Sequence, residues 1–304
     1  YHTMETCVTF TWMQLCDKLL ALTGNPFYAD QIEKSLYNAL MAALKDDASQ
    51  IAKYSPMEGH RCEGEEQCGM HINCCNANGP RAFALIPDFA VKKMGNEVYV
   101  NYYGDMSASL ENGHNKVLVK QHTTYPVSNV IDITIDVTKE NVFGLHLRVP
   151  VWSAQTVITL NGEELKDICP GTYHAITRKW KKGDHIQIIL DMPARLLEQN
   201  QMQAIVRGPI VLARDSRFND GFVDETLVVD SEDGIVKAEV DSVPGFAWMR
   251  LKVPVTVGTD LEGVGMYRNI SFCDFASAGN TWDKQVRYRV WIPRTLDVKK
   301  GHLK

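Results

Sequence analysis

Residues 131–137 read IDITIDV, so isoleucine or valine alternates with aspartate or threonine along the whole stretch. Successive side chains of a β-strand point to opposite faces of the sheet, and this alternation therefore predicts a strand with one buried face. Further short β-rich runs follow one another with turn signals between them, at residues 98–103, 116–121, 144–149, 156–160 and 186–190. Short strands at regular spacing favour a β-sandwich.

A hairpin and a second β-rich region extend this pattern towards the C-terminus. Asn161-Gly162 follows the run 156–160 directly, and this dipeptide suits a two-residue turn in which both positions need a positive φ. Beyond about residue 200, Gly208-Pro209 introduces more β-rich runs, at residues 210–213, 226–229, 235–240 and 286–292. We therefore expect a second β domain after the sandwich.

In the N-terminal third, apolar residues recur about every 3.6 positions instead of every two, and this spacing predicts helices. A first helix is expected from residue 8 to residue 20, before Gly24-Asn25-Pro26, and a second over residues 32–43. A third is expected from Pro80 to residue 94, with a kink or break at Pro87. Residues 45–79 lack periodicity and predict a long irregular segment, which is usually functional or disordered.

Composition limits the classes of function. The chain of 304 residues can bury a substantial core and is long enough for two or three domains. Its formal net charge of −5 provides no basic stripe for a phosphate backbone, so nucleic acid is not an expected partner. No run of about 18 apolar residues indicates a membrane span.

The cysteines point to a metal site rather than to a disulfide scaffold. Of the 8 cysteines, most fall in the first 75 residues and four fall between residues 62 and 75. Glu5, Cys7, Cys74 and Cys75 together offer one carboxylate and three thiols, a complete tetrahedral ligand set for zinc. Against this reading, a buried cysteine often behaves simply as a small hydrophobic residue.

Local geometry sets conditions on such a site. Glu5 and Cys7 point apart on a helix, so a helix must begin near Cys7 if both are to bind one ion. Cys74 and Cys75 are adjacent, and we expect a tight turn over residues 76–79 to aim both at one point before the helix at Pro80. A metal or the helix N-terminus would lower the thiol pKa towards neutrality and make one cysteine a nucleophile.

Glu5-Thr6-Cys7 and Cys74-Cys75-Asn76-Ala77-Asn78 resemble the Glu-Thr-Cys and Cys-Cys-x-x-Asn motifs of family 127 of the glycoside hydrolases, the β-L-arabinofuranosidases, and of the related family 146. Residues 54–58, YSPME, and 147–152, LRVPVW, are similar to two further segments of that family. Asn161-Gly162-Glu163, Trp180 with Gly183-Asp184, and Gly208-Pro209 also fit in order.

The resemblance implies a multidomain α plus β fold, in which the C-terminal part of an (α/α)6 barrel precedes two β-sandwich-type domains. By this match, residues 1–94 are the closing helices of the catalytic barrel, residues 95–200 form the first β-sandwich domain and residues 201–304 form the second β domain. The remainder of the barrel is then expected in an N-terminal portion of the same protein, ahead of Tyr1.

The same resemblance implies a zinc-dependent retaining glycoside hydrolase acting on plant-type glycans. Glu5, Cys7, Cys74 and Cys75 correspond to the zinc ligands, and Cys74 is also the nucleophile. Tyr54 and Glu5 would contact the sugar. The acid/base glutamate is expected upstream of this sequence, so the chain alone should not turn over substrate. Three thiolates and a carboxylate around Zn²⁺ carry a formal charge of about −2, which nearby donors or a retained thiol proton should offset.

The sequence departs from the family pattern at two points. The usual Cys-Cys-Pro-Pro-Asn is here Cys-Cys-Asn-Ala-Asn, and Cys62 and Cys68 are additional. A structural zinc knot using Cys62 and Cys68 is an alternative, although their spacing exceeds the usual two to four residues. His60 and His71 of the same segment are read as solvated, and Trp152 and Trp180 as core residues rather than sugar platforms.

An alternative function is a carbohydrate-binding or structural β-sandwich fragment with a purely structural zinc–cysteine site. The exact sugar, the linkage and the compartment, periplasm or cytoplasm of a bacterium, are left open by the sequence. The oligomeric state is open too, with a homodimer among the alternatives.

Overall fold

The computed structural model describes residues 4–64, 73–112, 115–241, 245–259 and 265–294. Its helical part comprises α1 (Thr6–Thr23), α2 (Phe27–Ser35), which continues as a π-helical turn η1 (Leu36–Leu40), and α3 (Cys75–Ala90). Gly24 ends α1 with a φ of 64°, and the side chain of Asn25 then accepts a hydrogen bond of 3.0 Å from the Phe27 amide. The predicted stop signal is therefore also the start of the next helix.

The bounds of α3 correct the prediction made from Pro80. The helix begins at Cys75, continues through both Pro80 and Pro87, and ends at Ala90. It stops there because residues 91–94 form strand β2 (Val91–Met94), which pairs with β3 (Glu97–Val100). The residues expected to form a tight turn, 76–79, are instead the first turns of α3.

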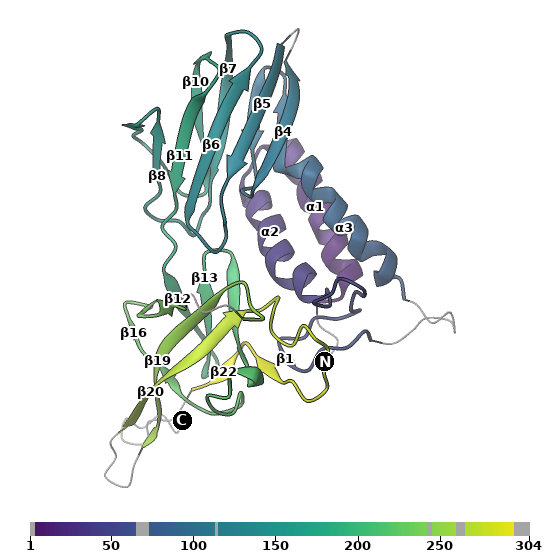
Figure 1. Ribbon diagram of the computed structural model, residues 1–304, viewed down its shortest axis with the longest axis vertical. Helices are drawn as coiled ribbons and strands as arrows, with labels where there is room; N and C mark the ends of the chain where they lie inside the picture. The colour runs from purple at the N-terminus through teal and green to yellow at the C-terminus, as the bar shows by residue number, and fades with distance from the viewer. Residues whose placement is uncertain (1–3, 65–72, 113–114, 242–244, 260–264, 295–304) are drawn as a thin grey trace. The chain divides into compact units, whose positions relative to one another are not determined.

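Two sheets follow the helices (Figure 1). A four-stranded sheet has the order β10-β7-β3-β2, with β7 (Asn141–Val149) and β10 (Thr172–Trp180) antiparallel and β3 parallel to β7. A six-stranded sheet has the order β4-β5-β6-β11-β8-β9, built from β4 (Met106–Asn112), β5 (Asn115–His122), β6 (Val130–Val137), β11 (Asp184–Ile189), β8 (Val157–Leu160) and β9 (Glu163–Glu164). Strand β6 is the IDITIDV stretch, and its isoleucines are fully buried.

The predicted hairpin at Asn161-Gly162 is confirmed. Asn161 and Gly162 have φ values of 53° and 88°, and they connect Leu160 of β8 to its cross-strand partner Glu163 of β9. Both turn residues therefore adopt the left-handed region that this type of turn requires.

The C-terminal β-rich region forms one large sheet of 12 strands. Its central order is β15-β19-β20-β14-β13-β12-β17-β16. Four further strands pair outside this order: β18 with β19, β22 with β13, β21 with β14, and β1 with β21. The longer strands are β12 (Ala194–Gln199), β13 (Met202–Arg207), β14 (Ile210–Asp215), β19 (Arg250–Thr259) and β20 (Gly265–Asp274). The short ones are β1 (Glu58–Gly59), β15 (Val228–Val229), β16 (Ser231–Glu232), β17 (Ile235–Val236), β18 (Glu239–Val240), β21 (Tyr288–Arg289) and β22 (Ile292–Pro293), and a 3₁₀ turn η2 (Ser216–Phe218) follows β14.

The chain forms two compact units, each assembled from separate segments. One unit combines residues 1–9, 36–79 and 193–304, and the other combines residues 10–35 and 80–192. Helices α1 and α3 each begin in the first unit and continue in the second. The division into residues 1–94, 95–200 and 201–304 stays a prediction.

Each unit has a buried arginine that ties its segments together. In the second unit, Arg148 of β7 pairs with Asp30 and Glu33 of α2, and its side chain is fully buried. In the first unit, Arg61 is buried and donates to the backbone carbonyls of Ala42, Phe275 and Ala278. Buried charges of this kind persist only where partners satisfy them.

Helix α1 presents an apolar stripe to solvent. Val8, Trp12, Leu15 and Leu22 are 62%, 39%, 48% and 81% exposed, and they recur at helical spacing along one side. Large exposed apolar faces usually contact another polypeptide segment. Among the described residues, none of the helices has the length and apolar character needed to span a membrane.

Candidate functional site

Four side chains from two distant stretches of the sequence meet at the starts of α1 and α3. One ligand atom each from Glu5, Cys7, Cys74 and Cys75 lies within 4.8 Å of every other. The sulfur of Cys7 is 2.9 Å from that of Cys74 and 3.2 Å from that of Cys75. The predicted convergence of three thiols and one carboxylate is therefore confirmed, and all four residues belong to the same compact unit.

The segment before α1 is held in place by the irregular segment around residues 51–55. The Thr6 amide donates to the Lys53 carbonyl over 3.0 Å, and the Thr6 hydroxyl donates to the Ala52 carbonyl over 2.7 Å. Glu5 forms an isolated antiparallel bridge with Tyr54. Because Glu5 is still extended and α1 begins at Thr6, Glu5 and Cys7 can both face the cluster, as the sequence required.

A capping box at the start of α3 positions Cys74 and Cys75. The Asn73 side chain accepts a hydrogen bond of 2.9 Å from the Cys75 amide, and the Asn76 side chain accepts one of 2.9 Å from the Asn73 amide. Such a reciprocal pair satisfies backbone donors that a helix start leaves without partners. The adjacent cysteines therefore reach one point from the first turn of a helix, rather than from the predicted loop turn.

Close packing brings this turn of α3 against the irregular segment. A Cβ on Gly79 would lie 2.5 Å from Cδ1 of Ile51, which is itself buried. A larger residue at this position would force Ile51 to shift, so Gly79 allows the close contact between α3 and the irregular segment.

Asn78 is a contact that the sequence reasoning did not assign. Its side-chain amide donates to the sulfur of Cys7 over 3.2 Å, and its backbone amide donates to the Cys74 carbonyl over 3.1 Å. Asn78 is the last residue of the Cys-Cys-x-x-Asn motif, so the signal was present in the sequence. It provides one of the nearby donors expected to offset the negative charge of the ligand set.

The thiols differ in exposure, and the pKa values of Cys74 and Cys75 are raised. Cys75 is fully buried, whereas Cys7 and Cys74 are partly exposed. The pKa of Cys74 is raised by its hydrogen bond with Cys7 and then by burial, and burial also raises the pKa of Cys75. The lowering of a thiol pKa expected from the sequence, by a metal or by the helix N-terminus, stays a prediction.

The donor set fits a zinc ion. A tetrahedron with zinc–sulfur bonds of about 2.3 Å has edges of about 3.8 Å, so four donor atoms that lie within 4.8 Å of one another can surround one ion with small adjustments. A dication would also compensate the acidic groups whose mutual proximity raises the thiol pKa values.

Comparison with known families agrees with this geometry. Residues 1–88 match the family model described as the GH127 catalytic domain of beta-L-arabinofuranosidase, and residues 97–192 match the GH127 middle domain of the same enzyme. The two models follow each other in the expected order. The chain belongs to the GH127 beta-L-arabinofuranosidase family.

One curated relative of this GH127 chain is the non-reducing end beta-L-arabinofuranosidase of Bifidobacterium longum subsp. longum. The two are 24% identical over 245 residues, which are 71% of this chain and 36% of that protein. The GH127 chain therefore spans about a third of the length of that relative.

Solved structures show the same fold. A GH127 beta-arabinofuranosidase matches with a TM-score of 0.81 and 22% identity over 96% of this chain and 49% of that chain. The GH127 beta-L-arabinofuranosidase from Geobacillus stearothermophilus T6 matches with a TM-score of 0.80 and 21% identity, over 96% and 50% of the two chains. This GH127 chain thus combines N-terminal helices with β-rich domains, and spans about half of these structures.

The other residues singled out in the GH127 sequence lie in different settings. Tyr54 is held beside Glu5 by the backbone bridge, with the Lys53 ammonium 5.3 Å from the centre of its ring. Cys62 and His60 are exposed, and Cys62 is not part of the metal-ligand group. Cys68 and His71 lie outside the described residues, so the alternative zinc knot stays a prediction.

Of the two tryptophans expected in the core, Trp180 is clearly a core residue. Trp180 is fully buried and donates from its indole nitrogen to the Phe143 carbonyl over 3.0 Å, as expected of a residue that fills a sandwich. Trp152 is partly buried in a turn.

Proposed function

We propose that this chain is part of a zinc-dependent retaining glycoside hydrolase that releases β-L-arabinofuranosyl units from plant-type glycans, with Cys74 as the nucleophile. The observation that carries the proposal is the meeting of three sulfurs and one carboxylate at the starts of α1 and α3. Membership of the GH127 family supports the substrate class. The helices of residues 1–94 would then be the closing part of an (α/α)6 barrel, whose remaining helices would cover the exposed stripe of α1.

Each ligand has a distinct role in this proposal. Glu5, Cys7 and Cys75 would hold the metal, and Cys75 is buried, as suits a residue with a purely structural task. Bound zinc would supply the positive charge that keeps the Cys74 sulfur ionised at neutral pH. Asn78 would fix the Cys7 sulfur through its hydrogen bond.

Exposure favours Cys7 and Cys74 over the buried Cys75, and the family resemblance selects Cys74 of these two as the nucleophile. Its sulfur attacks the anomeric carbon, a carbon–sulfur bond forms and the glycosidic carbon–oxygen bond breaks. The leaving oxygen takes a proton from an acid that we place upstream of this sequence. Water then displaces the sulfur from the opposite side, so that the configuration is retained. Tyr54 and Glu5 would border the sugar that is attacked.

A purely structural zinc site within a carbohydrate-binding or structural protein is the second candidate. The observation that favours it is the ligand count, because four protein donors complete a tetrahedron, and closed four-ligand sites are usually structural. The two functions differ in whether the Cys74 sulfur reacts with a sugar.

Covalent labelling separates them. We would load the chain with zinc, treat it with an arabinofuranose analogue that carries an electrophile at the anomeric carbon, and map the adduct by peptide mass spectrometry. The proposal predicts one zinc per chain and labelling at Cys74, with labelling lost in Cys74→Ser. Zinc binding without labelling of Cys74 would support the structural site. A protein that binds no zinc at this cluster would contradict both.

A further inference from the structure

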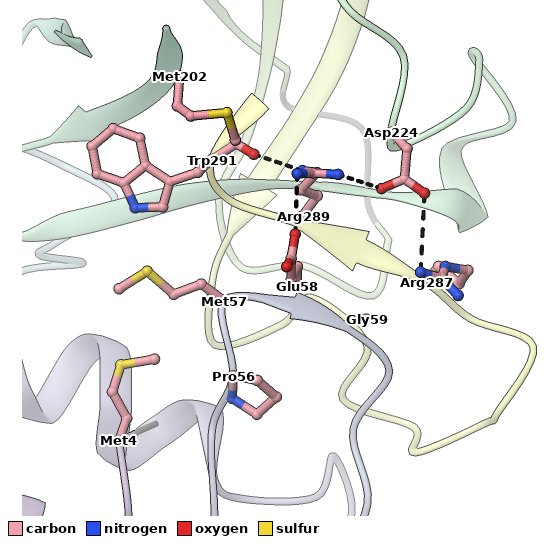
Figure 2. A pocket seen from close by; sticks show the side chains of 10 residues that line it. All are labelled: Met4, Pro56, Met57, Glu58, Gly59, Met202, Asp224, Arg287, Arg289 and Trp291. Carbon is pink, nitrogen blue, oxygen red and sulfur yellow. Dashed lines mark hydrogen bonds and ion pairs between the residues drawn. The ribbon is translucent and has the colours of Figure 1, made fainter. Parts of the chain in front are cut away.

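The first compact unit contains a pocket that the zinc–cysteine cluster does not use. The cavity measures about 720 Å³ and lies between β1, β13, β21 and the segments around Met4 and Asp224. Ligand pockets in proteins usually measure about 300–1,000 Å³, so this cavity is large enough for a small organic ligand. Figure 2 shows its lining side chains, which divide into an apolar group and a charged group.

The charged group is centred on Arg289. Its guanidinium lies 2.8 Å from the Asp224 carboxylate and 3.2 Å from that of Glu58, and its Nε donates to the Trp291 carbonyl over 2.7 Å. Arg289 is 19% exposed, whereas Asp224 and Glu58 are 54% and 58% exposed. The guanidinium is thus fixed by three partners, while both carboxylate side chains line the cavity and are more than half exposed.

The charges on this side are balanced. Arg287 also reaches Asp224, at 4.0 Å, so two guanidinium groups face two carboxylates. A pocket with no net charge gives neither an anion nor a cation a Coulombic advantage. It offers donors and acceptors side by side, which suits the hydroxyl groups of a neutral ligand.

The apolar group offers a surface for the other side of such a ligand. Trp291 lies with Met57 and Met202 on one side of the pocket, opposite Asp224 and Arg287 (Figure 2). Trp291 is partly buried and packs against a core cluster, so its ring is held in place. A rigid aromatic ring beside polar groups matches the amphipathic surface of a sugar, whose ring presents C–H groups on one face and hydroxyls at the edge.

The pocket is connected to the zinc–cysteine cluster through two backbone segments. Met4 lines the pocket and directly precedes Glu5, while Pro56, Met57 and Glu58 line it a few residues after Tyr54. The two segments are joined by the Glu5–Tyr54 bridge and by a hydrogen bond of 3.3 Å from the Ser55 amide to the Met4 carbonyl.

We propose that this pocket is a carbohydrate-binding site for a neutral sugar unit of the glycan, stacked on Trp291 and hydrogen-bonded by Asp224, Glu58 and Arg289. The proposal rests on the proposed function for its choice of sugar class. It is distinct from the reaction at Cys74, because binding in the pocket can be measured in a chain that cannot form a bond to the sugar.

The test is calorimetric titration of the whole chain, in a Cys74→Ser background, with a neutral L-arabinose trisaccharide and with a trigalacturonate of equal length. We expect the neutral sugar to bind and the acidic one to bind more weakly. Trp291→Ala should raise the Kd for the neutral sugar by about tenfold or more, through loss of the stacking surface. Tyr267→Ala, an aromatic residue that is 79% exposed and does not line the pocket, is the matched control and should leave the Kd unchanged.

Asp224→Ala keeps the test decisive if Trp291→Ala disturbs the core cluster. Asp224 is half-exposed, so its removal should leave the fold intact and raise the Kd by about fivefold, the effect of one lost hydrogen bond. Absence of binding by the neutral sugar, preference for the acidic sugar, or an unchanged Kd in the Asp224 variant would each overturn the proposal. Labelling of Cys74 is independent of these outcomes, so the two proposals can fail separately.

Discussion

The side-chain amide of Asn78 donates a hydrogen bond to the sulfur of Cys7 over 3.2 Å, although the two residues are 71 positions apart in the sequence. The bond joins the first turn of α3 to the first turn of α1. It also places the positive end of an amide dipole beside a sulfur that would carry negative charge when it binds a metal.

Replacement of Asn78 by alanine should weaken zinc binding. Removal of a group that hydrogen-bonds to a metal ligand typically lowers affinity by about 10- to 100-fold, because the ligand loses its orientation and charge compensation. Competition with a chromophoric chelator measures the change. Asn269→Ala, at an exposed position of β20, is the control. Equal affinities in the two variants would show that Asn78 has no part in the site.

Replacement of Asn73 by alanine should reduce both stability and metal affinity. The variant loses the acceptor for the Cys75 amide, a helix-capping interaction that contributes about 1 kcal/mol to the free energy of unfolding. Urea unfolding monitored by circular dichroism measures this change. Asn73→Asp retains an acceptor and should restore most of the lost stability. A variant with alanine that is as stable as the parent would refute the capping role.

Much of the β structure could be predicted from the sequence because one-sided burial leaves a strong alternating pattern, as in β6. Strands β10, β19 and β20 lie outside the predicted runs. β20 begins with polar and exposed residues such as Tyr267 and Asn269, so it lacks clean alternation. β19 does alternate, because Leu251, Val253, Val255 and Val257 are buried between more exposed neighbours, so its signal was present in the sequence although the strand was not predicted. Their pairing with each other and with β14 stabilises them in the folded chain.

The candidate site, too, could be predicted where the signal lies in a short sequence motif, and could not where it depends on contacts between distant residues. The four residues that converge there could be predicted because they are carried by short motifs whose chemistry is distinctive. The start of α3 was misplaced because Pro80 is a strong local signal, while the reciprocal bonds of Asn73 and Asn76 are visible only in three dimensions. The pocket beside Trp291 could not be predicted, since its lining comes from segments more than 200 residues apart.

Cys62 should be dispensable for the zinc site. Cys62→Ser should leave one zinc per chain, because this exposed residue lies outside the ligand group, whereas Cys7→Ser should lower the zinc content. Metal analysis after dialysis measures both. Loss of zinc in Cys62→Ser would instead support the structural knot suggested by the spacing of Cys62 and Cys68.

Arg148→Met should destabilise the second unit strongly. The side chain of Arg148 is buried and donates to Glu33 over 2.6 Å and to the Asn101 carbonyl over 2.6 Å, and it also pairs with Asp30. Its loss leaves two buried carboxylates without compensation, which typically costs about 3–5 kcal/mol. Urea unfolding of the variant measures this loss.

The control for Arg148 is an exposed ion pair in the same unit. Lys120 pairs with Asp136 at 2.9 Å and is 49% exposed, so Lys120→Met should cost less than about 1 kcal/mol. Addition of Glu33→Gln and Asp30→Asn to Arg148→Met should recover part of the stability, because it removes the buried charges. A similar loss in the Arg148 and Lys120 variants would contradict this account.

Asp274 should make the stability of the first unit depend on pH. Its side chain is fully buried, and burial raises its pKa to about 6 despite hydrogen bonds from the Met249 and Ser277 amides. The folded state therefore holds the proton more tightly than the unfolded state, whose aspartate pKa is about 3.9. Stability from this group is complete below about pH 4 and is lost as the pH rises to about 6, a change of about 3 kcal/mol.

Urea unfolding of the parent and of Asp274→Asn across this pH range measures the effect. The excess unfolding free energy of the parent over Asp274→Asn should shrink as the pH rises, while Glu239→Gln, at an exposed position, should show no such trend. A difference in unfolding free energy between the parent and Asp274→Asn that stays constant from about pH 4 to pH 6 would mean that Asp274 does not titrate in this range.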